Sequence, residues 1–312
     1  MKYADKVLRE LRPALEASPK IDLVKDLTSV RNMRAPEIKN SPHVKTSSCM
    51  INGPASELSV KVYEPVNRAN VKLPALFWIH GGGYVLGHPD SDDGLCEAFV
   101  MGAKCVVISI NYRLAPEHPY PAAVEDCYWG LKWVAENAEY LKIDSSRIAI
   151  AGASAGGGLA AAIALMARDR GGPAIVFQMP LYPMLDDRNE TPSSYEICEE
   201  NLSTVWHREV NQIAWQMYLG ENISGEISPY AAPARAAELT GLPPAYTCVG
   251  QLDPFRDETL DYVRRLAQAG VPVEFHLYPG CFHGFDAIFN NAEISRQARN
   301  EYIIALAKAF NK

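Results

Sequence analysis

Short, continuously apolar runs alternate along this chain with longer segments of helical periodicity, and this alternation restricts the fold more than any other feature. Leu73–Ile79 and Cys105–Ile110 are almost uniformly apolar, as expected of strands buried on both faces. Similar runs occupy 147–151, 174–177, 245–249 and 273–277, and period-two alternation over 58–63 indicates an earlier strand. Helical patterns cover roughly 92–102, 121–138, 155–169, 255–269 and 292–310. The sequence therefore predicts an α/β fold, with helices on both faces of a mostly parallel sheet.

Two segments fall outside this alternation. Residues 1–55 hold a short charged amphipathic stretch followed by Pro-, Ser- and Asn-rich chain, and residues 183–225 lie between two strands without containing one. Extra helical material in an open α/β sheet usually covers the ligand crevice at the carboxyl ends of the strands. We therefore expect one domain, 1–312, with a cap formed by about 1–45 and an insertion at about 183–225.

Composition and charge exclude several classes of partner. The chain has 30 basic and 37 acidic residues, a net charge of −7, which argues against a nucleic-acid-binding surface. Its longest uncharged small-apolar stretch, Leu159–Ala167, is far shorter than the roughly 20 residues of a membrane span. The N-terminal residues mix both charge signs without the apolar core of a secretory signal, so we expect a cytoplasmic protein.

Cysteine and histidine spacing gives no sign of a disulfide framework or a metal site. The seven cysteines are scattered and form no C-x-x-C pair, so free thiols are expected. No H-E-x-x-H motif and no Cys/His cluster with ligand spacing is present. The sequence predicts no bound metal.

The pentapeptide Gly152–Gly156 reads G-A-S-A-G and matches the G-x-S-x-G pattern. It follows the predicted strand 147–151 and opens an Ala-rich helix. A serine on such a tight strand-to-helix turn projects its Oγ above the sheet, and the flanking glycines leave room for the cramped backbone. The alternative is a glycine-rich helix start that only packs closely on a strand. The context favours Ser154 as a nucleophile.

The loop after the strand 73–79 contains three consecutive glycines, in His80–Gly83. Such a loop adopts backbone conformations closed to other residues and can point N–H groups at a ligand. An acyl-transfer enzyme needs donors of this kind for the oxyanion of its tetrahedral intermediate. A dinucleotide-binding loop is disfavoured, because GGGYVLG departs from G-x-G-x-x-G and no ribose-binding acid follows the next strand.

A nucleophilic serine also needs a base and an orienting acid. His283 stands in the loop just after the last predicted strand, and Asp253 comes immediately after the strand before it. Asp257 and Glu258 fall in the first turn of the next helix, where acids commonly only complement the helix dipole. The chain order Ser154, Asp253, His283 is the one expected of α/β-hydrolases.

Five motifs, in this order, resemble those of the hormone-sensitive-lipase family of α/β-hydrolases, the bacterial family IV carboxylesterases. They are HGGG at 80–83, NYRLAPEHPYPAA at 111–123, GASAGG at 152–157, DPFRDE at 253–258 and HGF at 283–285. The likeness spans roughly Val71 to Phe285. It implies an α/β-hydrolase fold with an eight-stranded sheet and a helical cap, and ester hydrolysis without a cofactor.

The resemblance also implies a role for each matching residue. Ser154 would be the nucleophile that carries the acyl-enzyme, His283 the general base and Asp253 the orienting acid. The implied substrates are short- to medium-chain acyl esters. One departure is Ala153, where most relatives carry an acid before the nucleophile. The implied oxyanion-hole donors are the backbone N–H groups of Gly82, Gly83 and Ala155.

Two functional alternatives to a serine carboxylesterase remain open. An acyltransferase would use the same acyl-enzyme with a different acceptor. A non-catalytic ligand-binding module on the same fold would be expected to carry a degraded triad. Four aromatic residues either line an apolar acyl pocket or, as is more common, belong to the core: Trp206, Trp215, Tyr218 and Phe285.

Two further points stay undecided at the level of sequence. Cys281, two residues before His283, is either buried and inert or a thiol whose modification would displace the base. The last predicted strand, 271–278, either pairs across a homodimer, as it often does in relatives, or is covered by the C-terminal helix. The expected partner is a small-molecule ester.

Overall fold

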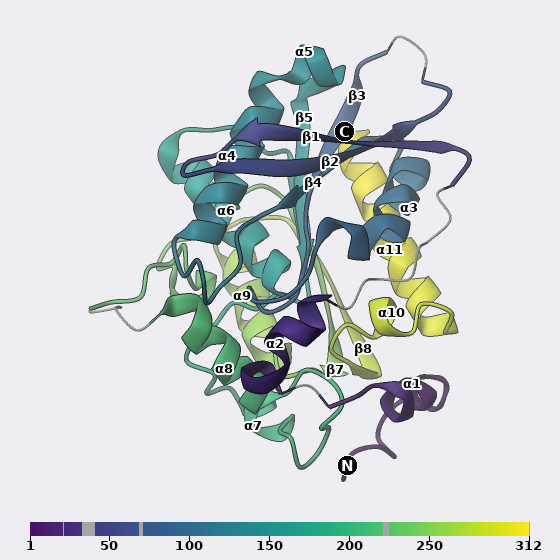
Figure 1. Cartoon of the computed structure of the whole chain (residues 1–312), viewed down its shortest axis with the longest axis vertical. Coiled ribbons are helices and arrows are strands. Elements are labelled where there is room, and N and C mark those ends of the chain that lie inside the picture. The colour runs from purple at the N-terminus through teal and green to yellow at the C-terminus, as the bar shows by residue number, and fades with distance from the viewer. Residues whose placement is uncertain (21, 33–40, 69–70, 221–224, 312) are drawn as a thin grey trace.

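The computed structural model describes residues 1–20, 22–32, 41–68, 71–220 and 225–311. Its eight-stranded sheet has the order β1-β2-β4-β3-β5-β6-β7-β8 (Figure 1). β2 (Glu57–Pro65) pairs antiparallel with β1 (Val44–Asn52) and with β4 (Val106–Asn111). All other pairings are parallel and involve β3 (Leu73–Ile79), β5 (Ile143–Ala153), β6 (Phe177–Leu181), β7 (Ala245–Leu252) and β8 (Val273–Phe282). The predicted mostly parallel sheet is confirmed.

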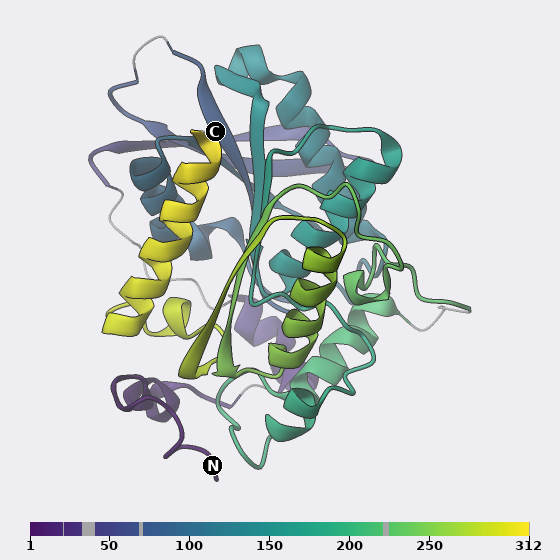
Figure 2. The same ribbon diagram turned by 180° about the vertical axis from the view of Figure 1, so that it is seen from behind.

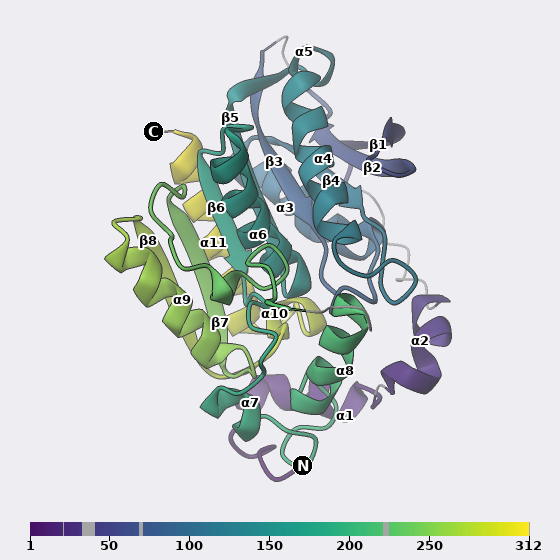
Figure 3. The same ribbon diagram turned by 90° about the vertical axis from the view of Figure 1, so that its left-hand side faces the viewer.

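Helices cover both faces of the sheet (Figure 3). One face carries α3 (Asp93–Ala103) and α11 (Glu293–Phe310), and the other α4 (Ala122–Glu136), α6 (Ala155–Arg170) and α9 (Arg256–Gln268). Within β3, Phe77 packs into the core with α4 and α6, whereas its neighbour Trp78 packs with α3 and α11. Because successive strand side chains point to opposite faces, a strand between two helical layers is apolar throughout.

The remaining elements are short or lie outside the strand–helix alternation. The N-terminal segment forms η1 (Arg9–Leu11), α1 (Arg12–Ala17) and α2 (Leu23–Asn32). The described part of 183–225 contains α7 (Pro192–Glu196) and α8 (Arg208–Leu219) and no strand. Single-turn elements are η2 (Pro89–Asp92), α5 (Ala138–Leu141), η3 (Pro233–Arg235) and α10 (Phe285–Ile288).

The helices of the two segments outside the alternation lie together at one end of the molecule. Figures 1 and 2 place α1, α2, α7 and α8 at the end toward which β7 and β8 point. α2 packs against α8, and Leu11 and Leu23 are fully buried. The N-terminal arm, which comprises η1, α1 and α2, is therefore part of the packed structure beside the carboxyl ends of the strands.

Three elements differ from the sequence-based expectation. β1 was not predicted, because an edge strand with exposed faces keeps a polar sequence; its pairing with β2 begins at Val44, inside the segment 1–45. β6 begins at Phe177, where the prediction ended, and contains Pro180, a residue that argues against a central strand. β5 begins at Ile143, four residues before the apolar run at 147–151.

No helix in the described residues is both long enough and apolar enough to cross a membrane. All seven cysteines are free thiols. Across those same residues, no three His, Cys, Asp or Glu side chains gather in an arrangement able to hold a metal ion.

Candidate active site

Four loops at the carboxyl ends of parallel strands carry the candidate residues. The glycine loop 80–83 follows β3, Ser154 follows β5, Asp253 follows β7 and His283 follows β8. Parallel strands of one sheet end at the same edge, so residues up to two hundred positions apart in the chain meet there.

Ser154 occupies the sharp turn between β5 and α6. Its backbone has φ +57° and ψ −119°, a conformation that a side-chain-bearing residue rarely adopts. Main-chain hydrogen bonds fix the turn, since Ser154 N–H donates to Leu181 O at 2.9 Å and its carbonyl accepts from Met184 N–H at 3.0 Å. A side chain on Gly152 or Gly156 would collide with main-chain oxygens, which explains both glycines of the motif.

His283 connects Ser154 with Asp253. Its Nε2 lies 2.9 Å from Ser154 Oγ, and its Nδ1 lies 2.8 Å from Asp253 Oδ2. Asp253 is fully buried, and its second oxygen accepts a hydrogen bond from Phe255 N–H at 2.8 Å. With Nδ1 protonated toward the carboxylate, Nε2 is free to accept the serine proton.

Aromatic rings surround the imidazole of His283. Phe255 and Tyr182 meet it edge-on, with ring centroids 4.9 Å and 5.2 Å away, and Trp206 lies at 6.3 Å. Trp206 is itself held by a hydrogen bond from its Nε1 to Asn211 Oδ1 at 3.1 Å. These rings restrict the orientation of the base.

The glycine loop turns its main chain beside Ser154. Gly82 and Gly83 have φ values of +117° and +61°, which favour glycine. Within the described chain, no backbone acceptor is paired with the N–H of Gly82 or Gly83, nor with the N–H of Ala155 at the first position of α6. These three N–H groups are therefore available to an oxyanion.

His80, the first residue of this loop, has a structural environment. It is buried and stacked on Tyr112, with ring centroids 4.3 Å apart, and Tyr112 Oη donates to its carbonyl at 3.0 Å. Burial lowers the pKa of His80 to about 4, so the ring is neutral at physiological pH. The contacts with Tyr112 hold the first residue of the glycine loop in place.

A cavity of about 450 Å³ opens over Ser154 and His283. Both segments outside the strand–helix alternation contribute to its wall, through Ser18 and Pro19 from the N-terminal arm and through residues 203–207 from the insertion. Of the four aromatics considered from the sequence, Trp206 lines the cavity. The others are buried in the core: Trp215, Tyr218 and Phe285.

Several residues of the cavity wall were not candidates in the sequence analysis, and Asp92 and Tyr182 are two of them. Asp92 lies at the start of a helical pattern, where acidic residues are common. Tyr182 follows β6, which begins later in the chain than the predicted strand 174–177. No local signal distinguishes them from surface or core residues. Ala153, the residue before the candidate nucleophile, also lines the cavity.

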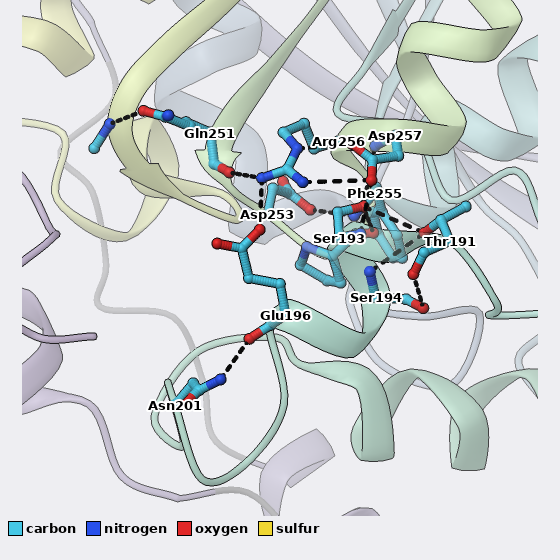
Figure 4. Close-up of polar contacts among 12 residues, drawn as sticks. Thr191, Ser193, Ser194, Glu196, Asn201, Gln251, Asp253, Phe255, Arg256 and Asp257 are labelled. Carbon is cyan, nitrogen blue, oxygen red and sulfur yellow. Dashed lines mark hydrogen bonds and ion pairs between the residues drawn. The ribbon is translucent and has the colours of Figure 1, made fainter. Parts of the chain in front are cut away.

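The acids after Asp253 hold neighbouring chain segments rather than His283. Asp257 accepts from Ser193 N–H at 2.7 Å and pairs with Arg256 Nε at 2.7 Å (Figure 4). Glu258 is buried, not merely at a helix N-terminus as expected, and accepts from Leu185 N–H at 2.7 Å. Burial raises the pKa of Glu258 well above its usual value.

Cys281 is fully buried, and its Sγ lies 3.6 Å from Pro279 O. Burial raises its pKa to about 12, so the thiol is protonated at neutral pH. This environment is that of an unreactive cysteine.

Comparison with known proteins identifies the family of the chain. A family model described as the alpha/beta hydrolase fold matches residues 76–287. Esterase LipI of Mycobacterium tuberculosis (strain ATCC 25618 / H37Rv) is 39% identical over 267 residues, which cover 85% of this chain and 82% of that protein. The chain belongs to the hormone-sensitive-lipase family of α/β-hydrolases.

Other members of the family extend the likeness to nearly the whole chain. Carboxylesterase NlhH of the same strain is 39% identical over 260 residues, 82% of this chain and 80% of that protein. The solved structure of a bacterial heroin esterase superposes with a TM-score of 0.91 at 38% identity and covers 98% of both chains. The family member described here is a carboxylic ester hydrolase.

Proposed function

We propose that this hydrolase cleaves carboxylic esters through an acyl-enzyme on Ser154, with His283 as general base and Asp253 as orienting acid. One observation carries the proposal: the His283 imidazole lies 2.9 Å from the serine hydroxyl and 2.8 Å from a buried carboxylate. These two distances are hydrogen-bond distances, as a serine-hydrolase triad requires.

The reaction follows from this placement of charge. His283 Nε2 takes the proton of Ser154 as Oγ attacks the ester carbonyl, and Asp253 stabilises the imidazolium. The histidine returns the proton to the departing alcohol and then activates a water that releases the acid. The oxyanion of each tetrahedral intermediate accepts from the backbone N–H groups of Gly82, Gly83 and Ala155.

The N-terminal arm and the insertion act as the cap of the site. Ser18 and Pro19 and residues 203–207 lie in the cavity wall, whereas the triad comes from the sheet loops. A cavity of about 450 Å³ suits small and medium-sized ligands, so short- to medium-chain acyl esters are the proposed substrates. The cap sets which esters fit, and the loops perform the chemistry.

The experiment that tests this function compares the wild type with Ser154→Ala. With p-nitrophenyl butyrate, the variant should lose measurable turnover while its far-UV spectrum and Tm stay near those of the wild type. A serine-directed phosphonate should label Ser154 alone. Appreciable turnover by the variant would contradict the assignment, and product analysis with added alcohol would identify an acyltransferase by a new ester.

The sheet edge offers a site for self-association. β8 is the last strand of the sheet, and within the described residues it pairs only with β7. We propose that two copies of the chain pair through this edge, the residues 271–278 included. Sedimentation velocity should then give a dimer, and Phe275→Pro, a substitution within β8, should convert it to a monomer.

A further inference from the structure

The cavity over Ser154 contains one isolated carboxylate. Among the described residues that line the cavity, Asp92 is the only acid, and none is a lysine or an arginine. The rest of the wall consists of glycines, aliphatic and aromatic side chains, hydroxyl groups and histidines. The residue next to the candidate nucleophile is Ala153, so it contributes no second carboxylate. A negative charge at Asp92 therefore dominates the recognition properties of this cavity.

A hydrogen bond from Trp78 fixes the orientation of the Asp92 carboxylate. Its Oδ2 accepts a hydrogen bond from Trp78 Nε1 at 2.7 Å, and Trp78 is a fully buried residue of β3. No donor elsewhere in the described chain reaches Oδ1. The side chain is half-buried and lies in the cavity wall. One oxygen is thus satisfied by the protein, and the other is left for a ligand.

The surroundings of Asp92 raise its pKa to about 6, so the carboxylate is mostly ionised at neutral pH. Burial is the largest cause of the rise, the hydrogen bond from Trp78 and the positive charge of Arg299 oppose it, and the negative charges of Asp286 and Asp93 add to it. In the described residues no basic group forms an ion pair with Asp92 within 4.0 Å. A desolvated anion without a cation partner is unfavourable, and a ligand cation would relieve that cost.

We propose that Asp92 is a specificity-determining residue that binds an ammonium group of the substrate, so that the enzyme prefers cationic esters to neutral esters of the same shape. The inference rests on the proposed function, because the ammonium group and the reacting carbonyl must occupy the same cavity. The contact adds binding to substrate and transition state and takes no part in proton transfer.

Two pairs of esters with matched shapes measure this preference. In the first, 2-(trimethylammonio)ethyl acetate is compared with 3,3-dimethylbutyl acetate, which places the charge on the alcohol side. In the second, p-nitrophenyl 4-(trimethylammonio)butanoate is compared with p-nitrophenyl 5,5-dimethylhexanoate, which places it on the acyl side. In at least one pair, the cationic-to-neutral ratio of kcat/KM should fall about 10- to 100-fold in Asp92→Asn, as expected for a charge contact in a partly buried site.

A matched control separates direct contact from the general field of the protein. Asn at position 92 keeps an acceptor for Trp78 and removes only the charge. Asp90→Asn makes the same change of charge two residues away, at an exposed side chain that pairs with Lys61 at 2.6 Å and does not line the cavity. This control should leave the ratio within about twofold of the wild type, because an exposed charge is strongly screened.

The wild-type enzyme gives a second test that needs no variant. As pH falls from 8 to 5, Asp92 becomes protonated, so the ratio should decline with a midpoint near 6. Protonation of His283 affects both esters of a pair and cancels in the ratio. His207 also lines the cavity, with its Nδ1 2.9 Å from Glu209 Oε2, and the same scan in Asp92→Asn reports its contribution.

The outcomes distinguish the inference from the proposed function. The role of Asp92 would be overturned if the cationic-to-neutral ratio of kcat/KM were the same in the wild type, Asp92→Asn and Asp90→Asn and did not change with pH. If neutral esters were still hydrolysed, that result would leave the proposed serine esterase intact. If Asp92→Asn fails to fold, the same ratio and the same pH scan are measured in Asp92→Ser, which also removes the charge and keeps an oxygen acceptor for Trp78. Absence of turnover with every ester would refute the proposed function itself.

Discussion

Replacing Asp253 with asparagine should trap His283 in the tautomer that cannot accept the proton of Ser154. Asp253 Oδ1 accepts a hydrogen bond from Phe255 N–H at 2.8 Å, and both residues are labelled in Figure 4. An asparagine preserves that bond only with its carbonyl oxygen toward Phe255. Its NH2 group then faces His283 Nδ1 and donates to it, so the ring proton moves to Nε2.

The magnitude follows from the geometry on the other side of the ring. Nε2 lies 2.9 Å from Ser154 Oγ and, once protonated, is a donor where the mechanism needs an acceptor. Since position 253 is fully buried, water cannot supply the missing acceptor. A wrong tautomer of this kind lowers kcat by about 10⁴, which corresponds to about 5.4 kcal/mol in the activation free energy.

The assay compares kcat for p-nitrophenyl butyrate in Asp253→Asn and Asp257→Asn, with Tm recorded for both. Asp257 accepts from Ser193 N–H at 2.7 Å (Figure 4). It is not a hydrogen-bond partner of His283, whose two ring nitrogens contact Ser154 and Asp253. Its replacement should cost about 1–2 kcal/mol of stability and change kcat by less than about threefold. A larger loss of kcat in Asp257→Asn than in Asp253→Asn would show that the orienting acid is misassigned.

Substitutions in the loops and in the cap provide three further tests. Gly83→Ala should lower kcat by at least about 10-fold, because Gly83 has a φ of +61° and a Cβ at this position collides with the ring of Trp206. If this clash is the cause, the double variant Gly83→Ala/Trp206→Ala should recover part of the lost kcat. Cys281→Ala should leave maleimide sensitivity unchanged at pH 7.5, since the buried thiol is protonated; protection by the substitution would contradict this. Ser18→Trp should lower kcat/KM for an octanoate ester relative to a butyrate ester, and an unchanged ratio would place the arm outside the acyl site.

The sequence alone predicted the parts of the protein that local pattern encodes. A run such as Leu73–Ile79 is apolar at every position because a strand between two helical layers buries both faces. Ser154, Asp253 and His283 each come shortly after a predicted strand. Since parallel strands end at one edge of a sheet, this placement predicted that the three residues lie close together. Fold class and candidate triad therefore required no knowledge of side-chain packing.

The sequence failed where burial depends on the neighbours of a residue. β1 is an edge strand with exposed faces, so its side chains carry no apolar signal. Trp206 and Trp215 lie nine residues apart in one insertion, yet the first lines the cavity and the second lies in the core. Periodicity gives the face of a helix that is buried, and it does not say which loop residue reaches the site.

Asp92 is the clearest case of a property that only the tertiary structure decided. In the sequence it is one of three acids near a helix start, equivalent in type to Asp90 and Asp93. In the fold, Asp90 and Asp93 both pair with Lys61, while Asp92 turns to Trp78 and into the cavity. The environment of a carboxylate is set by residues distant in sequence that pack around it, and no local pattern records them.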